Sequence, residues 1–330
     1  MLNLHNATHL ASVALILLLS SCGGGGAPEA RAPIEPPESV SVFYTCDTRG
    51  NLDACNCPQG VAGGLARRST YLESNRKGPS ILVDAGNVTH GSLPFEVFEM
   101  EFLLKGYTAM NYDAVNLGER ELSLGAARIK ALSDQFPLLV SANVRDASGM
   151  PIVPNHRIVT LADGYRIGIM GVVKSNVPSD LIAQDLKVLP EEEAIAQALP
   201  ELQAQSDLIV LLAYVDLQRM KALAERFFEI GIIVGGDVQQ PSAEAEIANR
   251  SLLVYTTDKG KTIGSLNVGF AGGQPVPMAN EITMLLEDQP GTKAVAALLN
   301  EFRIERTNRN YPVREETEAE HTALTPSAGG

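Results

Sequence analysis

The side chains with the greatest chemical capacity in this sequence gather in one short segment, CDTRGNLDACNCPQGVAGGLARR, residues 46–68. The apolar run before it reads as a buried strand, and Asp47 and Arg49 follow that strand directly. An acidic loop at the carboxyl end of a strand is typical of metal-ion or phosphate chemistry, because ligands of α/β sheets gather at that edge. The same loop holds three thiols, which suit disulfide exchange or soft metal ions, at Cys46, Cys55 and Cys57.

Three interpretations of these cysteines are open. The first is a structural disulfide that closes a small loop, most simply between Cys46 and either Cys55 or Cys57. The second is a redox-active thiol pair, and the third is a site for Zn or Cu at the same three residues. We expect the three cysteines to lie close together at the carboxyl end of the first strand. No C-x-x-C-H segment occurs, so covalent haem is not supported.

The chain begins with an apolar segment, HLASVALILLLSSC at residues 9–22, that is too short to span a bilayer and has the length of a signal-peptide core. It ends in Leu19-Ser20-Ser21-Cys22, which resembles the lipobox of bacterial lipoproteins. The resemblance implies cleavage before Cys22 and attachment of lipid to its sulfur. We therefore expect a signal peptide at 1–21, and a lipidated Cys22 with a Gly- and Pro-rich tether at 22–39.

These features predict a lipid-anchored protein of the bacterial cell envelope that faces the periplasm or the exterior. Gly23 stands where lipoproteins of the inner membrane have a retaining aspartate, so the outer membrane is favoured. The membrane is thus an expected partner through Cys22. Nucleic acid is not an expected partner, because the net charge is −13, tryptophan is absent and aromatic residues make up only 5% of the chain.

From Val40 onward, β-branched strand patterns alternate with helical patterns, which predicts a mainly parallel sheet with helices on its faces. One long helix, PFEVFEMEFLLKGYTAMN, begins with proline and follows the strand SILVDAG. Three strands without helices between them, SLLVYTT, TIGSLNVGF and EITMLLED, are expected to pair antiparallel at the end of the fold. Beyond it we expect a C-terminal helix at 289–308 and a disordered polar tail at 309–330.

Several short segments occur in an order that points to a known family. They are DTRG from Asp47, GGLARR from Gly63, DAGNVTHGS from Asp84, NYDAVNLGERE from Asn111 and YTTDKGKTIGSL from Tyr255. Together they resemble the N-terminal metallophosphatase domain of bacterial periplasmic 5′-nucleotidases, within the calcineurin-like superfamily. The resemblance covers residues 40–288 and implies a single α/β domain, a four-layer α/β/β/α sandwich. It also implies that the short segment after Asp288 does not supply the family's nucleoside-binding domain.

The family is a metal-dependent phosphohydrolase family whose site holds two cations on oxygen and imidazole ligands. The resemblance assigns the ligand and leaving-group positions to Asp47, Arg49, Asn87, Glu119, Arg120, Tyr214, Asp237 and Gln239. Asp47 alone keeps the family's residue type; histidines, an aspartate and an asparagine are replaced at the others. Guanidinium groups cannot ligate a cation and repel one. We therefore expect no centre of the two-metal type and a loss of phosphatase chemistry.

Alternative interpretations of the rebuilt site are open. In one, Arg49 and Arg120 are the counterions of a group of acids, Asp47, Glu119, Glu121, Asp216 and Asp237. In a second, Arg49, Arg120 and Asn87 bind a phosphate-containing or carboxylate ligand without cleaving it. A divergent phosphoesterase with a rebuilt site, or a module that binds another envelope protein, are further candidates. Arg67 and Arg68 read as surface residues of the first helix.

Overall fold

The computed structural model describes residues 34–57, 60–256, 259–286 and 289–313, with the side chains of residues 55–57 and 60 left aside. The predicted signal peptide, Cys22, most of the predicted tether and residues 314–330 of the predicted tail lie outside the described residues. Within the described ranges, no helix combines the length and the apolar character needed to cross a bilayer.

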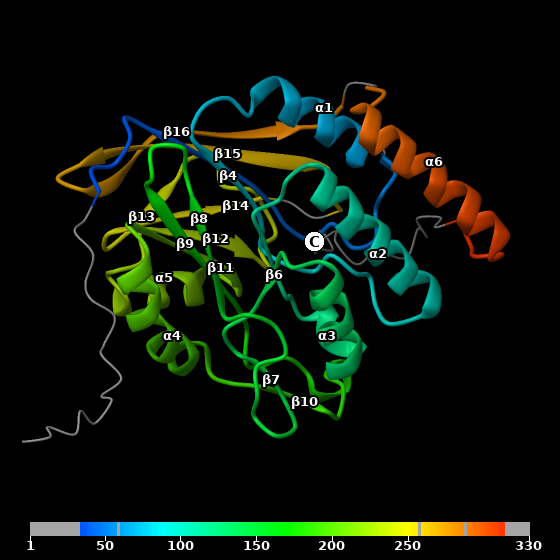
Figure 1. Cartoon of the computed structure of the whole chain (residues 1–330), viewed down its shortest axis with the longest axis horizontal. Helices are drawn as coiled ribbons and strands as arrows, with labels where there is room; N and C mark the ends of the chain where they lie inside the picture. The colour runs from blue at the N-terminus through cyan, green and yellow to red at the C-terminus, as the bar shows by residue number, and fades with distance from the viewer. Residues whose placement is uncertain (1–33, 58–59, 257–258, 287–288, 314–330) are drawn as a thin grey trace, which may run out of the picture. The chain divides into compact units, whose positions relative to one another are not determined.

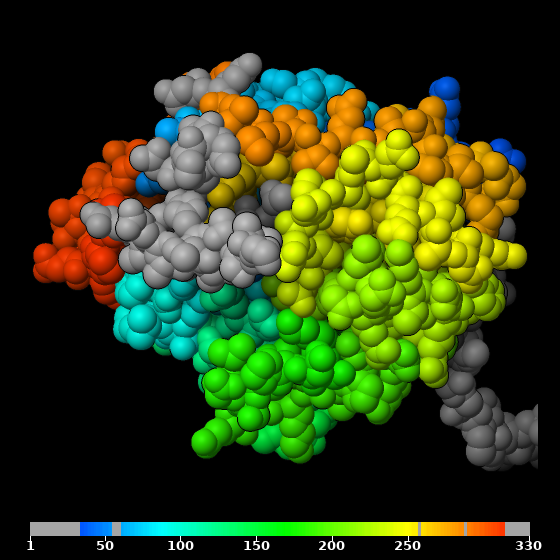
Figure 2. All heavy atoms as spheres, turned by 180° about the vertical axis from the view of Figure 1, so that it is seen from behind, coloured from blue at the N-terminus to red at the C-terminus, as the bar shows by residue number. Residues whose placement is uncertain are grey.

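The first of two six-stranded sheets has a parallel centre and an antiparallel edge (Figure 1). Its parallel strands are β1 (Val40–Thr45), β4 (Ser80–Asp84), β5 (Ala114–Asn116) and β6 (Leu139–Val140). On the other side of β1 lie two antiparallel strands, β15 (Thr262–Ala271) and β16 (Gln274–Met284). The strand β16 therefore forms one edge of this sheet, and it belongs to the orange part of the chain along the upper border of the view in Figure 2.

The second sheet also has parallel strands at its centre, but its two edge strands are both antiparallel. Its four central strands are parallel: β9 (Arg166–Val173), β11 (Leu208–Tyr214), β12 (Ile232–Gly236) and β14 (Ser251–Tyr255). Antiparallel strands close both edges, β8 (His156–Thr160) beside β9 and β13 (Glu246–Ala248) beside β14.

The expected antiparallel set at the end of the fold is partly wrong. The segment SLLVYTT forms β14, which lies in the second sheet and runs parallel to β12. Only β15 and β16 form the expected antiparallel pair, in the first sheet. The chain changes sheets between β14 and β15, so strands adjacent in sequence are not adjacent in space.

Six helices cover the outer faces of the two sheets among the described residues. Around the first sheet lie α1 (Leu65–Asn75), α2 (Pro94–Ala109), α3 (Ala126–Gln135) and α6 (Lys293–Asn308), which share one apolar core with it. Against the second sheet lie α4 (Glu191–Gln205) and α5 (Leu217–Arg226). A third core fills the space between the sheets, where Val42 and Val83 belong to the same cluster as Val210 and Val234. The predicted four-layer α/β/β/α sandwich is confirmed (Figure 1).

Shorter elements complete the fold. The apolar segment FPLLVSANV forms two separate strands, β6 and β7 (Val144–Asp146), and β7 pairs with β10 (Leu186–Val188) rather than with the first sheet. Asn143 lies between the two strands, and its side-chain nitrogen donates to the carbonyls of Val173 and Leu189 at 2.6 and 3.0 Å. The strands β2 (Cys55–Cys57) and β3 (Gly60–Ala62) form a small hairpin, and η1 (Arg120–Leu124) and η2 (Ser179–Leu181) are short 3-10 helices.

Candidate functional site

The carboxyl ends of the two sheets meet at the Asp47 side chain, which is 3% exposed and follows β1. Its Oδ1 atom accepts three hydrogen bonds, from Arg49 Nε at 2.9 Å, Asn87 Nδ2 at 3.0 Å and the Tyr214 hydroxyl at 2.9 Å. Asn87 follows β4 in the first sheet, and Tyr214 is the last residue of β11 in the second. The structure thus brings together four of the eight positions that the sequence assigned to this site.

The loops that carry these side chains have an unusual backbone. Asp47, Arg49, Asn87 and Asp237 adopt φ values of 51°, 48°, 58° and 58°, in the left-handed region that non-glycine residues rarely occupy. Each such residue costs about 1–3 kcal/mol, and residues of this kind cluster at functional sites. Hydrogen bonds hold the two loops of the first sheet in place, from Asp47 N to Gly86 O and from Arg49 N to Asn87 O. The strained loop geometry is therefore present although the side-chain chemistry differs from that of a two-metal site.

Asn87 connects the Asp47 loop with the loop after β5. Its Oδ1 accepts from the backbone nitrogen of Arg120 at 2.9 Å, and its Nδ2 also contacts the Tyr214 hydroxyl at 2.5 Å. Because it donates through one atom and accepts through the other, an ionised aspartate could not make the same set of contacts. The amide is thus the chemically required side chain in this arrangement.

A second ionic cluster is built around Lys174, a residue that the sequence reasoning missed. Its Nζ lies 2.8 Å from Glu119 Oε2 and 2.8 Å from Asp237 Oδ2. The three side chains are 21%, 18% and 34% exposed. Burial acts to lower the pKa of Lys174, but its hydrogen bonds to Asp237 and Glu119 raise it overall, so the amine is charged. The available signal was its position directly after the strand YRIGIMGVV, at the same edge as the acids.

One open interpretation made Arg49 and Arg120 the candidate counterions of a group of acids that includes Glu121, and for Glu121 the contacts differ from that interpretation. Its fully buried carboxylate accepts instead from three backbone nitrogens, those of Asn87 at 3.0 Å, Thr89 at 2.8 Å and Gly118 at 2.7 Å. Burial raises the pKa of Glu121 to about 7, and the three backbone hydrogen bonds act in the opposite direction. Glu121 therefore fixes the backbone beneath Asn87 and Glu119.

The remaining predicted positions lie apart from this cluster. Arg120 Nη1 donates to the His90 carbonyl at 2.7 Å, so the interpretation in which it pairs with the site's acids is not the arrangement found. Asp216 instead caps α5, where its Oδ1 accepts from the backbone nitrogen of Arg219 at 2.9 Å. Gln239 is exposed.

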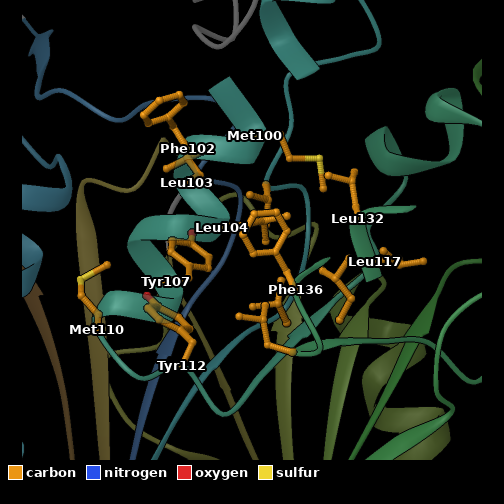
Figure 3. Close-up of a cluster of buried hydrophobic side chains, with 14 of the residues drawn as sticks. Met100, Phe102, Leu103, Leu104, Tyr107, Met110, Tyr112, Leu117, Leu132 and Phe136 are labelled. Atoms are coloured by element: carbon orange, nitrogen blue, oxygen red, sulfur yellow. The ribbon is translucent and has the colours of Figure 1, made fainter. Parts of the chain in front are cut away.

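The prediction that Arg68 lies on the surface is wrong, because its side chain is completely buried. Its Nη1 donates to the hydroxyls of Tyr107 and Tyr112, both at 3.1 Å, and its Nη2 donates to Thr48 Oγ1 at 3.2 Å. The two tyrosine rings stack with their centroids 4.1 Å apart (Figure 3). The signal was the helical spacing from Leu65, which places Arg68 on the buried face of α1. Through Thr48, this network fixes the residue next to Asp47.

The cysteines are only partly described. Cys46 is 1% exposed within the core between the sheets, and its Sγ donates to the Thr256 carbonyl at 3.5 Å. In the β2–β3 hairpin, the backbone of Cys55 lies opposite Ala62 and that of Cys57 lies opposite Gly60. The side chains of Cys55 and Cys57 are outside the described residues, so the proximity of the three thiols stays a prediction.

The donor atoms of this site do not fit two metal ions. Asp47 Oδ1 is filled by three protein donors, and the carboxylates of Glu119 and Asp237 bind one ammonium group. The Arg49 guanidinium is 2.9 Å from the Asp47 carboxylate and would repel a cation bound there. In the described part of the chain, no three His, Cys, Asp or Glu side chains are grouped so that they could hold a metal ion.

No protein-family model matches this chain. Its sequence is similar to that of 5′-nucleotidases, with 24% identity over 319 residues to the protein of Bos taurus and 25% over 312 residues to that of Diplobatis ommata. These matches cover 84% and 82% of this chain, and 54% and 51% of the relatives. The chain therefore spans about half the length of the relatives that it matches.

Solved structures with the same arrangement include a 5′-nucleotidase precursor from Thermus thermophilus, with a TM-score of 0.67 and 23% identity over 82% of this chain and 59% of that one. A calcineurin-like phosphoesterase from Bacillus subtilis has a TM-score of 0.68 and 18% identity, over 83% of this chain and 99% of that one. A sulfate thiohydrolase from Thermus thermophilus has a TM-score of 0.70 and 17% identity, over 84% of this chain and 62% of that one. The chain thus has the calcineurin-like metallophosphatase fold, and its sequence relatives are 5′-nucleotidases.

Proposed function

We propose that this chain is a lipoprotein of the bacterial cell envelope whose metallophosphatase-like domain does not hydrolyse phosphate esters by a two-metal mechanism. The observation that carries the proposal is the surroundings of Asp47, the one position that keeps the acidic ligand type of the family. Its Oδ1 is saturated by donors from Arg49, Asn87 and Tyr214. A metal ion at Asp47 Oδ1 would have to displace these contacts.

Charge strengthens this argument. A cation bound to the Asp47 carboxylate would lie close to the Arg49 guanidinium, which is itself 2.9 Å from that carboxylate. Two unit charges about 4 Å apart repel by about 4 kcal/mol at the dielectric of a partly buried site. A divalent ion would double this energy. The role that remains for the domain is binding or assembly at the envelope rather than hydrolysis.

Hydrolysis assays test the proposal directly. The full mature chain in detergent is incubated with nucleotides and with p-nitrophenyl phosphate, in Mn²⁺, in Zn²⁺ and in EDTA. The expected result is no turnover above that of the matched Asp47→Ala variant in any condition. Metal-dependent hydrolysis that the Asp47→Ala variant lacks would overturn the proposal and support a divergent phosphoesterase with a rebuilt site.

The arginines that a phosphate-containing ligand would need are already engaged within the protein. Arg49 is paired with Asp47, and Arg120 donates to the His90 carbonyl, so both guanidinium groups already have protein partners. Titration calorimetry with inorganic phosphate and with a nucleoside monophosphate tests whether such a ligand binds. Saturable binding without turnover would favour the phosphate-binding module.

Thiol chemistry is a second candidate function, supported by the C-x-C segment in the β2–β3 hairpin. The proposed groups are Cys46, Cys55 and Cys57, which would form a redox pair or bind Zn or Cu. Labelling of the native chain with and without reductant, together with metal analysis, tests it. One accessible, reductant-sensitive pair or a stoichiometric soft metal supports the candidate. A permanent disulfide without bound metal would leave a structural role.

A further inference from the structure

The strongest unassigned feature of the site is the Lys174 ammonium group, held at 2.8 Å by carboxylates that follow different strands. Glu119 follows β5 in the first sheet, whereas Asp237 follows β12 and Lys174 follows β9, both in the second. We propose that the Lys174 ammonium is a built-in cation that takes the structural place of a metal ion, joining the two sheets through Glu119 and Asp237. This inference rests on the proposed loss of the two-metal centre and extends it to a specific replacement.

In this cluster, two carboxylates face one positive charge. Both carboxylate oxygens lie at the same distance from one point, the Lys174 nitrogen. Ca²⁺ binds carboxylate oxygens at about 2.3–2.6 Å and takes about six to eight oxygen ligands, so these two carboxylates would supply part of a Ca²⁺ shell and water would supply the rest. The backbone of Lys174 is itself fixed, because its nitrogen donates to the Tyr214 carbonyl at 3.0 Å. The side chain is therefore directed into the site by a residue that contacts Asp47.

The charges of the cluster predict what its loss would do. Two carboxylates and one ammonium carry a net charge of −1, and removal of the ammonium leaves two like charges that share one small volume. The two carboxylates repel each other, and together they attract a divalent cation. Removing the amine should therefore create a cation site that the natural chain excludes.

An ordinary surface ion pair would behave differently. The Lys130–Asp134 pair has one carboxylate, its side chains are 65% and 67% exposed, and the two residues are one helical turn apart. Pairs of this kind contribute little to stability and leave no cation site when broken. Lys130→Met is therefore a matched control for Lys174→Met.

Thermal unfolding of the full mature chain in EDTA, Ca²⁺ or Mn²⁺ is the test. Lys174→Met should lower the melting temperature in EDTA by about 5 °C, and Ca²⁺ or Mn²⁺ should restore at least about half of this loss. The natural chain and Lys130→Met should show no comparable response to either ion. A folded Lys174→Met chain with no response to either cation would overturn the inference.

The metal response must also depend on the carboxylates. The double variant Lys174→Met/Glu119→Gln should lose it, and Mn²⁺ paramagnetic resonance should show one bound ion in the single variant only. A response that survives in the double variant contradicts the inference. If Lys174→Met does not fold in EDTA, refolding with Mn²⁺ should recover it, and failure to do so counts against the inference.

The outcomes separate this inference from the proposed function. Metal-dependent hydrolysis by the natural chain would refute the proposed function, whatever the variants do. A natural chain without hydrolysis, together with a folded but metal-indifferent Lys174→Met variant, would refute the replacement of a metal by Lys174 alone.

Discussion

The Tyr214 hydroxyl donates a hydrogen bond of 2.9 Å to the Asp47 carboxylate, although the two residues are 167 positions apart in the chain. The bond joins the carboxyl end of the second sheet to that of the first. Because both side chains are nearly completely buried, water does not replace the bond when it is lost. The free energy lost on removing this bond therefore reports how much the site contributes to holding the two sheets together.

Tyr214→Phe keeps the ring but removes this bond and also the hydroxyl that Asn87 Nδ2 contacts. We expect the free energy of unfolding to fall by about 1.5–3 kcal/mol, the range for a hydrogen bond to a charged group. Urea unfolding followed by circular dichroism measures the change. Tyr165→Phe is the control, because the hydroxyl of Tyr165 makes only a 3.4 Å bond to a carbonyl. Equal losses in both variants would show that the Asp47 contact has no special weight.

Asn87→Asp restores the acidic residue type that the family has at this position. It also places a second carboxylate against Asp47 and removes the donor to Asp47 and Tyr214. We expect a loss of about 2–4 kcal/mol from like-charge repulsion and a lost hydrogen bond, without any gain of metal-dependent hydrolysis. Asn87→Ala, which removes the donor without adding charge, should cost less. A phosphatase activity in Asn87→Asp would show that one substitution is enough to rebuild the centre.

Glu121 makes stability depend on pH. Its pKa is about 7 in the folded chain against an ordinary value of 4.5. The folded state therefore binds the proton more tightly, so this contribution to stability is complete below about pH 4.5 and is lost as the pH rises through 7. The slope approaches about 1.4 kcal/mol per pH unit within this window.

Urea unfolding of the natural chain and of Glu121→Gln, measured from pH 4.5 to 8, checks this prediction. Burial also raises the pKa of Asp47 and Asp84, so the difference between the two chains is the relevant quantity. This difference should decrease with rising pH and become constant above neutrality. A difference that instead increases with pH would show that the three backbone donors outweigh burial.

The lipid anchor is tested at its predicted attachment atom. Cys22→Ser removes the sulfur, so the variant should accumulate as an unprocessed or soluble precursor. Partitioning between detergent and water, with the natural chain in parallel, measures membrane association. A substituted chain that partitions like the natural one would remove the basis for the lipobox interpretation.

The fold was predictable because strand and helix patterns alternate along the chain and the landmark segments occur in the family's order. The partners of the charged side chains at the site were not predictable from the sequence. Lys174 reaches Glu119 and Asp237 only after β9, β5 and β12, which belong to two different sheets, have brought their carboxyl ends together, and no local sequence pattern predicts these contacts. For Glu121, the sequence indicated only charged side chains as candidate partners. The actual partners are backbone N–H groups, whose positions depend on the folded loops. For Arg68, helical spacing carried the signal, but a buried arginine contradicts the usual exposure of its type.

The edge strand β16 contains Pro275 and Pro277, and neither residue has a backbone N–H to offer. An exposed edge is a template for strands of other chains, and proline removes donors from that template. Met278 on the same strand is 61% exposed and adds an apolar side chain to this edge, which favours contact with other chains. The two prolines thus remove two potential donors from this edge, which disfavours pairing with the sheet edge of another copy of the domain.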